Sequence, residues 1–159
     1  MKKCLMLVLT LTLAALPTAT FATFDLIQEA CRVEGNTVTT SFAVVNFNSP
    51  VPVADLHLLP ENPVPGCTII GSGAPVGWSS TLNAANLGVD YLALDPASYV
   101  YAGQILHGFN FVLDPEYCCY IAQFTGPNHE VLAEVEKCFS CVHVGVAPET
   151  WGNVKQLFR

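Results

Sequence analysis

The stretch that decides the fold covers residues 105–138 and reads ILHGFNFVL-DPE-YCCYIAQF-TGPNH-EVLAEVEKC. It contains three runs rich in β-branched and aromatic residues, separated by the turn signals Asp114-Pro115 and Gly126-Pro127. Proline restricts φ to one narrow range and glycine can adopt positive φ, so both pairs favour chain reversals. Three consecutive strands with tight links predict a meander, which needs a second layer to cover its apolar face.

The apolar residues around this stretch alternate as in half-buried strands. Phe109, Phe111 and Leu113 share one face at period two, and burying each contributes about 2–3 kcal/mol. Upstream, residues 37–47 give the clearest early strand, and shorter runs occupy 24–33, 53–59, 67–70, 78–82 and 89–94. Residues 71–77 predict a glycine-rich loop, and residues 142–146 a further edge strand. The pattern predicts an all-β, antiparallel β-sandwich of about seven to nine strands.

The N-terminus has the organisation of a secretory signal peptide. Lys2 and Lys3 precede an apolar run at 5–16, and Thr20 and Ala22 supply small residues for a cleavage site. We expect cleavage after Ala22, giving a signal peptide (1–22), a sandwich domain (23–146) and a tail (147–159). The expected location is secreted or at the cell surface. No later stretch reaches the roughly 18 apolar residues of a membrane span, so none is expected after cleavage.

The charge of the chain argues against nucleic acid as a partner. Removing Lys2 and Lys3 leaves four basic residues against thirteen acidic ones, a net charge of −9. Such a surface repels phosphate backbones.

Six cysteines remain after cleavage, and an even number in an exported chain predicts disulfide bonds. Adjacent residues of a strand point to opposite faces, so Cys118 and Cys119 should bond to different partners. The hairpin over residues 125–129 brings Cys138 close to both. The alternatives are a zinc site and a C-x-x-C redox pair at 138–141, but export favours oxidation and no βαβ pattern is present. We expect three disulfide bonds and no metal, from the set Cys31, Cys67, Cys118, Cys119, Cys138 and Cys141.

Three short motifs form a further pattern: Gly77-Trp78, Val89-Asp90-Tyr91, and the segment AGQILHGFNF at residues 102–111. Together they resemble the layout of exported bacterial β-sandwich proteins of the PEP-CTERM and related surface-anchored type. The resemblance implies an immunoglobulin-like or fibronectin-III-like sandwich and carries no catalytic residue. Two features depart from the pattern: Ala102 stands where proline is usual, and no Pro-Glu-Pro followed by a membrane helix and an arginine cluster closes the chain.

No motif predicts catalysis or a cofactor. The glycines at 71–77 lack the Lys-Ser/Thr of a phosphate-binding loop, and Ser79 and Ser80 do not form G-x-S-x-G. His57 and Asp55 share a strand face and could ligate a metal. We expect instead that both are solvated polar residues on a half-exposed strand. The other histidines, His107, His129 and His143, are scattered. We therefore expect a protein that is not an enzyme.

The C-terminal tail combines apolar and basic side chains in one short segment, in an otherwise acidic chain. Thr150 can cap a short helix, which is marginal alone and needs something to bind. The two interpretations are a helix docked on the sandwich and a sorting tag recognised by envelope or secretion machinery. The residues concerned are Trp151, Val154, Leu157 and Phe158 on one face, with the basic Lys155 and Arg159.

These observations favour a non-enzymatic structural, adhesive or surface-display module of the bacterial envelope. The alternative is a carbohydrate- or ligand-binding module that uses loop aromatics. Trp78 would then act as an exposed platform and not as a core residue. The candidate ligand-contact residues are Trp78, Tyr91, Tyr99 and Tyr101.

Overall fold

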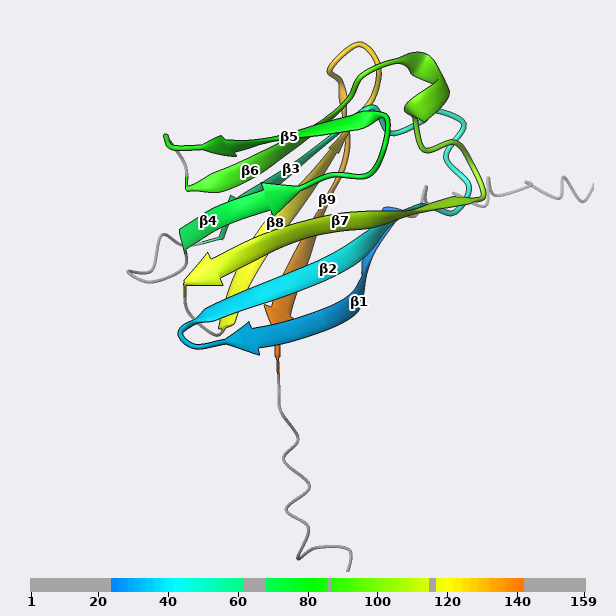
Figure 1. Cartoon of the computed structure of the whole chain (residues 1–159). Helices are drawn as coiled ribbons and strands as arrows, with labels where there is room; N and C mark the ends of the chain where they lie inside the picture. The colour runs from blue at the N-terminus through cyan, green and yellow to red at the C-terminus, as the bar shows by residue number, and fades with distance from the viewer. Residues whose placement is uncertain (1–23, 62–67, 86, 115–116, 142–159) are drawn as a thin grey trace, which may run out of the picture.

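The computed structural model describes residues 24–61, 68–85, 87–114 and 117–141. In these ranges the chain forms nine β-strands and one short 3₁₀ turn, η1 (Pro96–Ser98), and no α-helix (Figure 1). The predicted all-β architecture is confirmed. The strands are β1 (Phe24–Glu34), β2 (Thr37–Asn46), β3 (Asp55–Pro60), β4 (Thr68–Gly73), β5 (Trp78–Asn83), β6 (Gly88–Ala93), β7 (Gln104–Asp114), β8 (Tyr117–Thr125) and β9 (Val131–Ser140).

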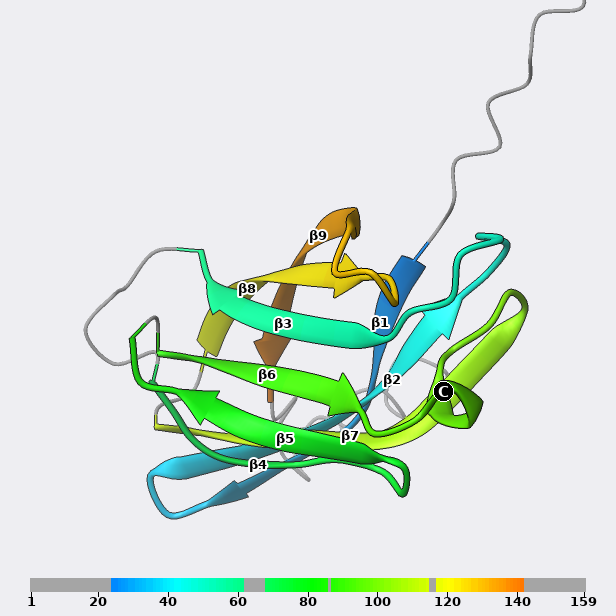
Figure 2. The ribbon, with the colours of Figure 1, turned by 90° about the horizontal axis from the view of Figure 1, so that it is seen from above.

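The strands form two antiparallel sheets that lie face to face (Figure 2). One sheet has the order β1-β2-β7-β4, and the other has the order β5-β6-β3-β8-β9. The predicted meander is wrong, because β7 belongs to the first sheet while β8 and β9 form a hairpin in the second. The inner face of β7 packs against rings of the opposite sheet, such as Phe111 against Phe139 at 4.9 Å between centroids. The chain therefore crosses between layers after β7.

The core is built from alternate residues on the inner faces of the strands. Phe42 on β2 is fully buried, and its ring lies 5.5–5.8 Å from four other aromatic rings. Offset and edge-to-face ring pairs at such distances add to the free energy of burying apolar area. Phe109, Phe111 and Leu113 are buried as expected, and further inward residues of β2 and β3 are buried with them: Val38, Thr40, Val44, Leu56 and Leu58.

Within the described part of the chain, side-chain hydrogen bonds link the two sheets at an interior position and at one edge. The Tyr91 hydroxyl of β6 donates to the main-chain oxygen of Asn110 on β7 at 2.8 Å. At the β1–β9 edge, Lys137 Nζ donates to Asp25 Oδ1 at 2.7 Å. These contacts fix the relative position of the layers at two separate points.

Gly77 and Trp78 close one end of the core. Gly77 has φ +85°, and an added Cβ would lie 2.1 Å from Ser98 Oγ, so this turn requires glycine. Trp78 then enters β5 with its ring edge-on to Phe109 at 5.1 Å between centroids, and its Nε1 donates to Ser98 O at 2.7 Å. The turn therefore seats the indole against both β7 and η1.

The glycine-rich segment is only partly a loop. Gly71, Ser72 and Gly73 belong to β4 and pair with β7, whereas the expectation was a loop over the whole of 71–77. A Cβ at Gly73 would lie 2.8 Å from Asn110 Nδ2, so glycine here leaves room for the Asn110 side chain of the neighbouring strand.

Across the described ranges, no helix has the length and apolar character needed to cross a membrane.

Candidate functional site

The cysteines form disulfide bonds at one end of the sandwich. Cys119 on β8 stands opposite Cys138 on β9 and is bonded to it. Cys31 of β1 is bonded to Cys141. Cys118 is also disulfide-bonded and is 1% exposed, on the face opposite to Cys119. The adjacent cysteines thus enter different bonds, as expected; Cys67 lies outside the described residues.

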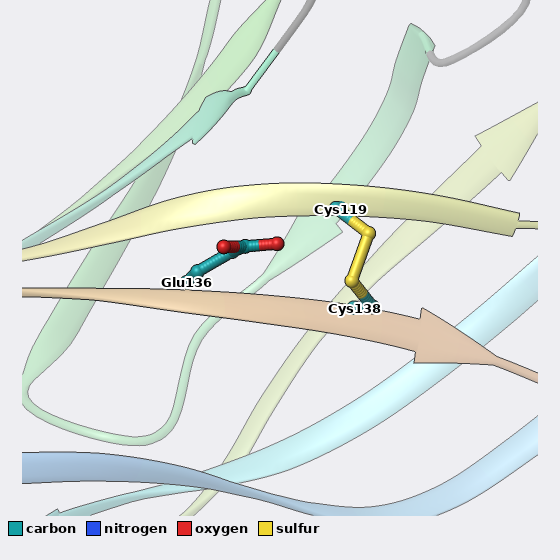
Figure 3. A group of neighbouring side chains, drawn as sticks. All are labelled: Cys119, Glu136 and Cys138. Carbon is teal, nitrogen blue, oxygen red and sulfur yellow. A yellow bond between two sulfur atoms is a disulfide. The ribbon is translucent and has the colours of Figure 1, made fainter.

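This pairing leaves no thiolate set for zinc in the part of the chain described. Figure 3 shows the carboxylate of Glu136 beside the Cys119–Cys138 bond, and ligand atoms of the three residues lie within 4.8 Å of one another. Zinc binds thiolates, and sulfurs joined in a disulfide are not thiolates. Cys138 and Cys141 have different partners, so they do not form a C-x-x-C redox pair either.

Two of the four candidate ligand-contact aromatics are in the core, which corrects that expectation. Trp78 is 5% exposed and Tyr91 is fully buried, because both rings point between the sheets. Burial also raises the pKa of the Tyr91 phenol well above its ordinary value near 10. Neither ring can stack on a ligand.

Tyr99 and Tyr101 remain near the surface at one end of the sandwich. Their ring centroids are 6.4 Å apart with planes tilted by 41°, so the rings are neighbours but not coplanar. Tyr99 lines a shallow depression of about 390 Å³ together with Val76 and Ile105, which are 100% and 48% exposed. This end combines aromatic, apolar and polar groups, the mixture found in small-ligand sites.

A second feature, the polar row, crosses the outer face of the five-stranded sheet. Neighbouring strands place one polar side chain each in register: Thr81 opposite Asp90, Asp90 opposite His57, His57 opposite Gln123, and Gln123 opposite Glu134. Gln123 Nε2 donates to Glu134 Oε1 at 2.8 Å. Sequence reasoning missed this row, although each of its strands shows a polar residue at the outward position.

Two histidines on this face are each held by a carboxylate. His57 Nδ1 lies 2.8 Å from Asp90 Oδ1, and Asn83 Nδ2 donates to Asp90 Oδ2 at 3.1 Å. His129 Nδ1, from the β8–β9 turn, lies 3.1 Å from Asp55 Oδ2. Asp55 is 4% exposed, so the expectation of a solvated carboxylate at this position is wrong.

Both histidine–aspartate pairs line one shallow depression of about 480 Å³. Leu92 and Val131, 46% and 54% exposed, supply apolar walls. A histidine held by an aspartate supplies two of the three members of a nucleophile-activating triad. Two of the hydroxyls that line the depression donate to main-chain oxygens: Ser79 Oγ to Leu92 O, and Thr125 Oγ1 to Asp55 O.

The proposed cleavage site and the tail residues Trp151, Lys155, Phe158 and Arg159 lie outside the described residues.

Comparison with known proteins supports the fold assignment and gives no information about function. No protein-family model matches the chain. No curated protein matches it either. Among solved structures, it is similar to an uncharacterized protein from Nocardia farcinica whose crystal structure has an immunoglobulin-like fold, with a TM-score of 0.53 and 12% identity. The match covers 72% of this chain and 96% of the other.

By its fold and strand order, the chain is therefore an immunoglobulin-like β-sandwich. At 12% identity the likeness concerns the fold alone.

Proposed function

We propose that this chain is an exported, non-enzymatic module of the bacterial envelope with a structural, adhesive or surface-display role. The observation that carries the proposal is the disulfide-bonded immunoglobulin-like sandwich, with the Cys119–Cys138 and Cys31–Cys141 bonds. Disulfides form and persist in oxidising compartments, in agreement with a signal peptide at residues 1–22.

The test of this proposal is fractionation of cells that produce the full chain. We expect the protein outside the cytoplasm, accessible to added protease, with its tail needed for retention. Deleting residues 150–159 should change surface retention and leave the melting temperature nearly unchanged. A cytoplasmic location of the full chain would contradict export, and a large fall in melting temperature with normal retention would contradict the sorting role of the tail.

A second candidate, glycan binding, is favoured by one observation. Tyr99 and Tyr101 lie together beside the depression formed with Val76 and Ile105. Aromatic faces beside polar groups suit sugar rings, which have an apolar face and polar edges. Screening wild-type protein against a glycan panel should give binding that is lost in Tyr99→Ala and kept in Ile27→Ala, an exposed apolar residue of β1. No binding, or equal loss in both variants, would remove this candidate.

A further inference from the structure

The depression on the five-stranded sheet contains two imidazoles that are held in the same way. A carboxylate only accepts hydrogen bonds when ionised, so His57 donates its Nδ1–H to Asp90 and His129 donates its Nδ1–H to Asp55. In the neutral form of each ring, this donation leaves the Nε2 lone pair available to a ligand. The two residues come from β3 and from the β8–β9 turn, far apart in sequence, and line one depression.

This is the arrangement that metal-ligating histidines have in proteins. Such a histidine nearly always donates its other ring N–H to a carboxylate or carbonyl group, which orients the ring and increases the basicity of the ligating nitrogen. We propose that His57 and His129 bind a divalent transition-metal ion of the zinc and copper type through their Nε2 atoms. Water would complete the coordination. The proposal does not depend on the adhesive or glycan-binding role.

The aspartates act as positioning residues and not as ligands. Both oxygens of Asp90 are occupied, one by His57 and one by Asn83. Asp55 is buried beneath His129, with 5% of its side chain exposed. The imidazoles themselves are reachable from solvent, since 29% of the His57 side chain and 81% of the His129 side chain are exposed. The acidic character of the chain, −7 overall, favours the approach of a cation.

The donor atoms determine the class of metal. Imidazole nitrogen suits zinc, copper and nickel, whereas calcium and magnesium require oxygen ligands. Since both carboxylates are engaged by histidine, we expect little calcium or magnesium binding here. Affinity should be higher for Cu²⁺ than for Zn²⁺, in the usual order for divalent ions.

The chain offers a matched control. His107 of β7, in the other sheet, also faces a carboxylate, that of Glu29 on β1. It is a third histidine–carboxylate pair, but it does not line the depression. A site that needs two imidazoles should depend on His57 and His129 and not on His107.

The experiment is calorimetric titration of the untagged, oxidised mature protein with ZnCl₂, repeated with CuCl₂ and CaCl₂. We expect one zinc ion per chain and a rise in melting temperature on binding. His57→Gln and His129→Gln should each weaken zinc binding at least tenfold, and His107→Gln should leave it unchanged. Asp90→Asn, which touches no metal, should weaken it by roughly 10–100-fold.

Several results would overturn the proposal: no zinc binding by the wild type, equal losses in all three histidine variants, or calcium binding with similar affinity. His129 is exposed on a turn, so His129→Gln should keep the fold even if His57→Gln does not. Unchanged zinc binding in folded His129→Gln would by itself contradict the two-imidazole site.

Discussion

The hydroxyl of Tyr91 donates a hydrogen bond to the main-chain oxygen of Asn110 at 2.8 Å, across the interior of the sandwich. Tyr91 lies on β6 of one sheet and Asn110 on β7 of the other. The tyrosine is fully buried, so no water can replace the bond. A buried polar group therefore helps to fix how the two layers stack.

Tyr91→Phe should lower the free energy of unfolding by about 1–3 kcal/mol, because the main-chain oxygen of Asn110 loses this donor. Urea denaturation followed by circular dichroism measures the change. Wild-type stability in this variant would show that the inter-sheet bond contributes nothing.

Tyr120→Phe is the matched comparison, and its expected effect is different. Tyr120 is also fully buried, but its hydroxyl has no hydrogen-bond partner among the described residues. Removing a buried hydroxyl without a partner relieves a desolvation cost, so stability should be unchanged or higher. A loss as large as that in Tyr91→Phe would contradict this interpretation.

Alkaline pH should destabilise the fold through these two phenols. Burial raises the pKa of both Tyr91 and Tyr120 above the unfolded value of about 10. Their contribution to stability is complete below that unfolded pKa and is lost as pH rises above it, because only the unfolded chain ionises readily. Ultraviolet titration should show late phenolate formation coincident with unfolding; full phenolate formation in a folded protein would contradict the burial.

Gly77→Ala should be markedly more destabilising than Gly103→Ala. Both glycines have positive φ, +85° and +77°, so both variants carry backbone strain. Only at Gly77 would the new Cβ meet a neighbour, Ser98 Oγ at 2.1 Å; nothing lies within 4 Å at Gly103. The difference between the two melting temperatures isolates the steric contribution, and equal temperatures would contradict it.

The Cys31–Cys141 and Cys119–Cys138 disulfides should differ in their contribution to stability. Cys31–Cys141 joins residues 110 positions apart, and Cys119–Cys138 joins residues 19 apart. Loop-closure entropy predicts about 5 kcal/mol for the longer loop and about 3 kcal/mol for the shorter one. Cys31→Ser/Cys141→Ser should therefore unfold at lower denaturant concentration than Cys119→Ser/Cys138→Ser. The reverse order would show that loop entropy does not dominate.

Strand positions and inner faces could be predicted from the sequence because they depend on local alternation. Phe109, Phe111 and Leu113 are buried as their period-two spacing requires. The hairpin signal at Gly126-Pro127 likewise placed Cys138 beside Cys119. Local spacing does not say which sheet a strand joins, so β7 was wrongly grouped with β8 and β9.

The candidate sites depend on contacts between distant parts of the chain. Asp55 and His129 are 74 residues apart, and Asp55 is buried in the folded chain, which local spacing does not indicate. The polar row requires the register of five strands, although Asp90, His57 and Gln123 each stand at a visible outward position. Tyr91 resembled a loop aromatic in sequence and is instead part of the core, because the opposite sheet covers it.

The central claim, an exported sandwich held by disulfides, is tested most directly by the intact mass of the protein recovered from outside the cytoplasm. The mass is measured after alkylation, with and without prior reduction. We predict a chain that begins at Thr23, takes up no alkyl group unless reduced, and takes up six after reduction, one for each mature cysteine. A chain that keeps residues 1–22, or one alkylated at Cys119 and Cys138 without reduction, would contradict the account.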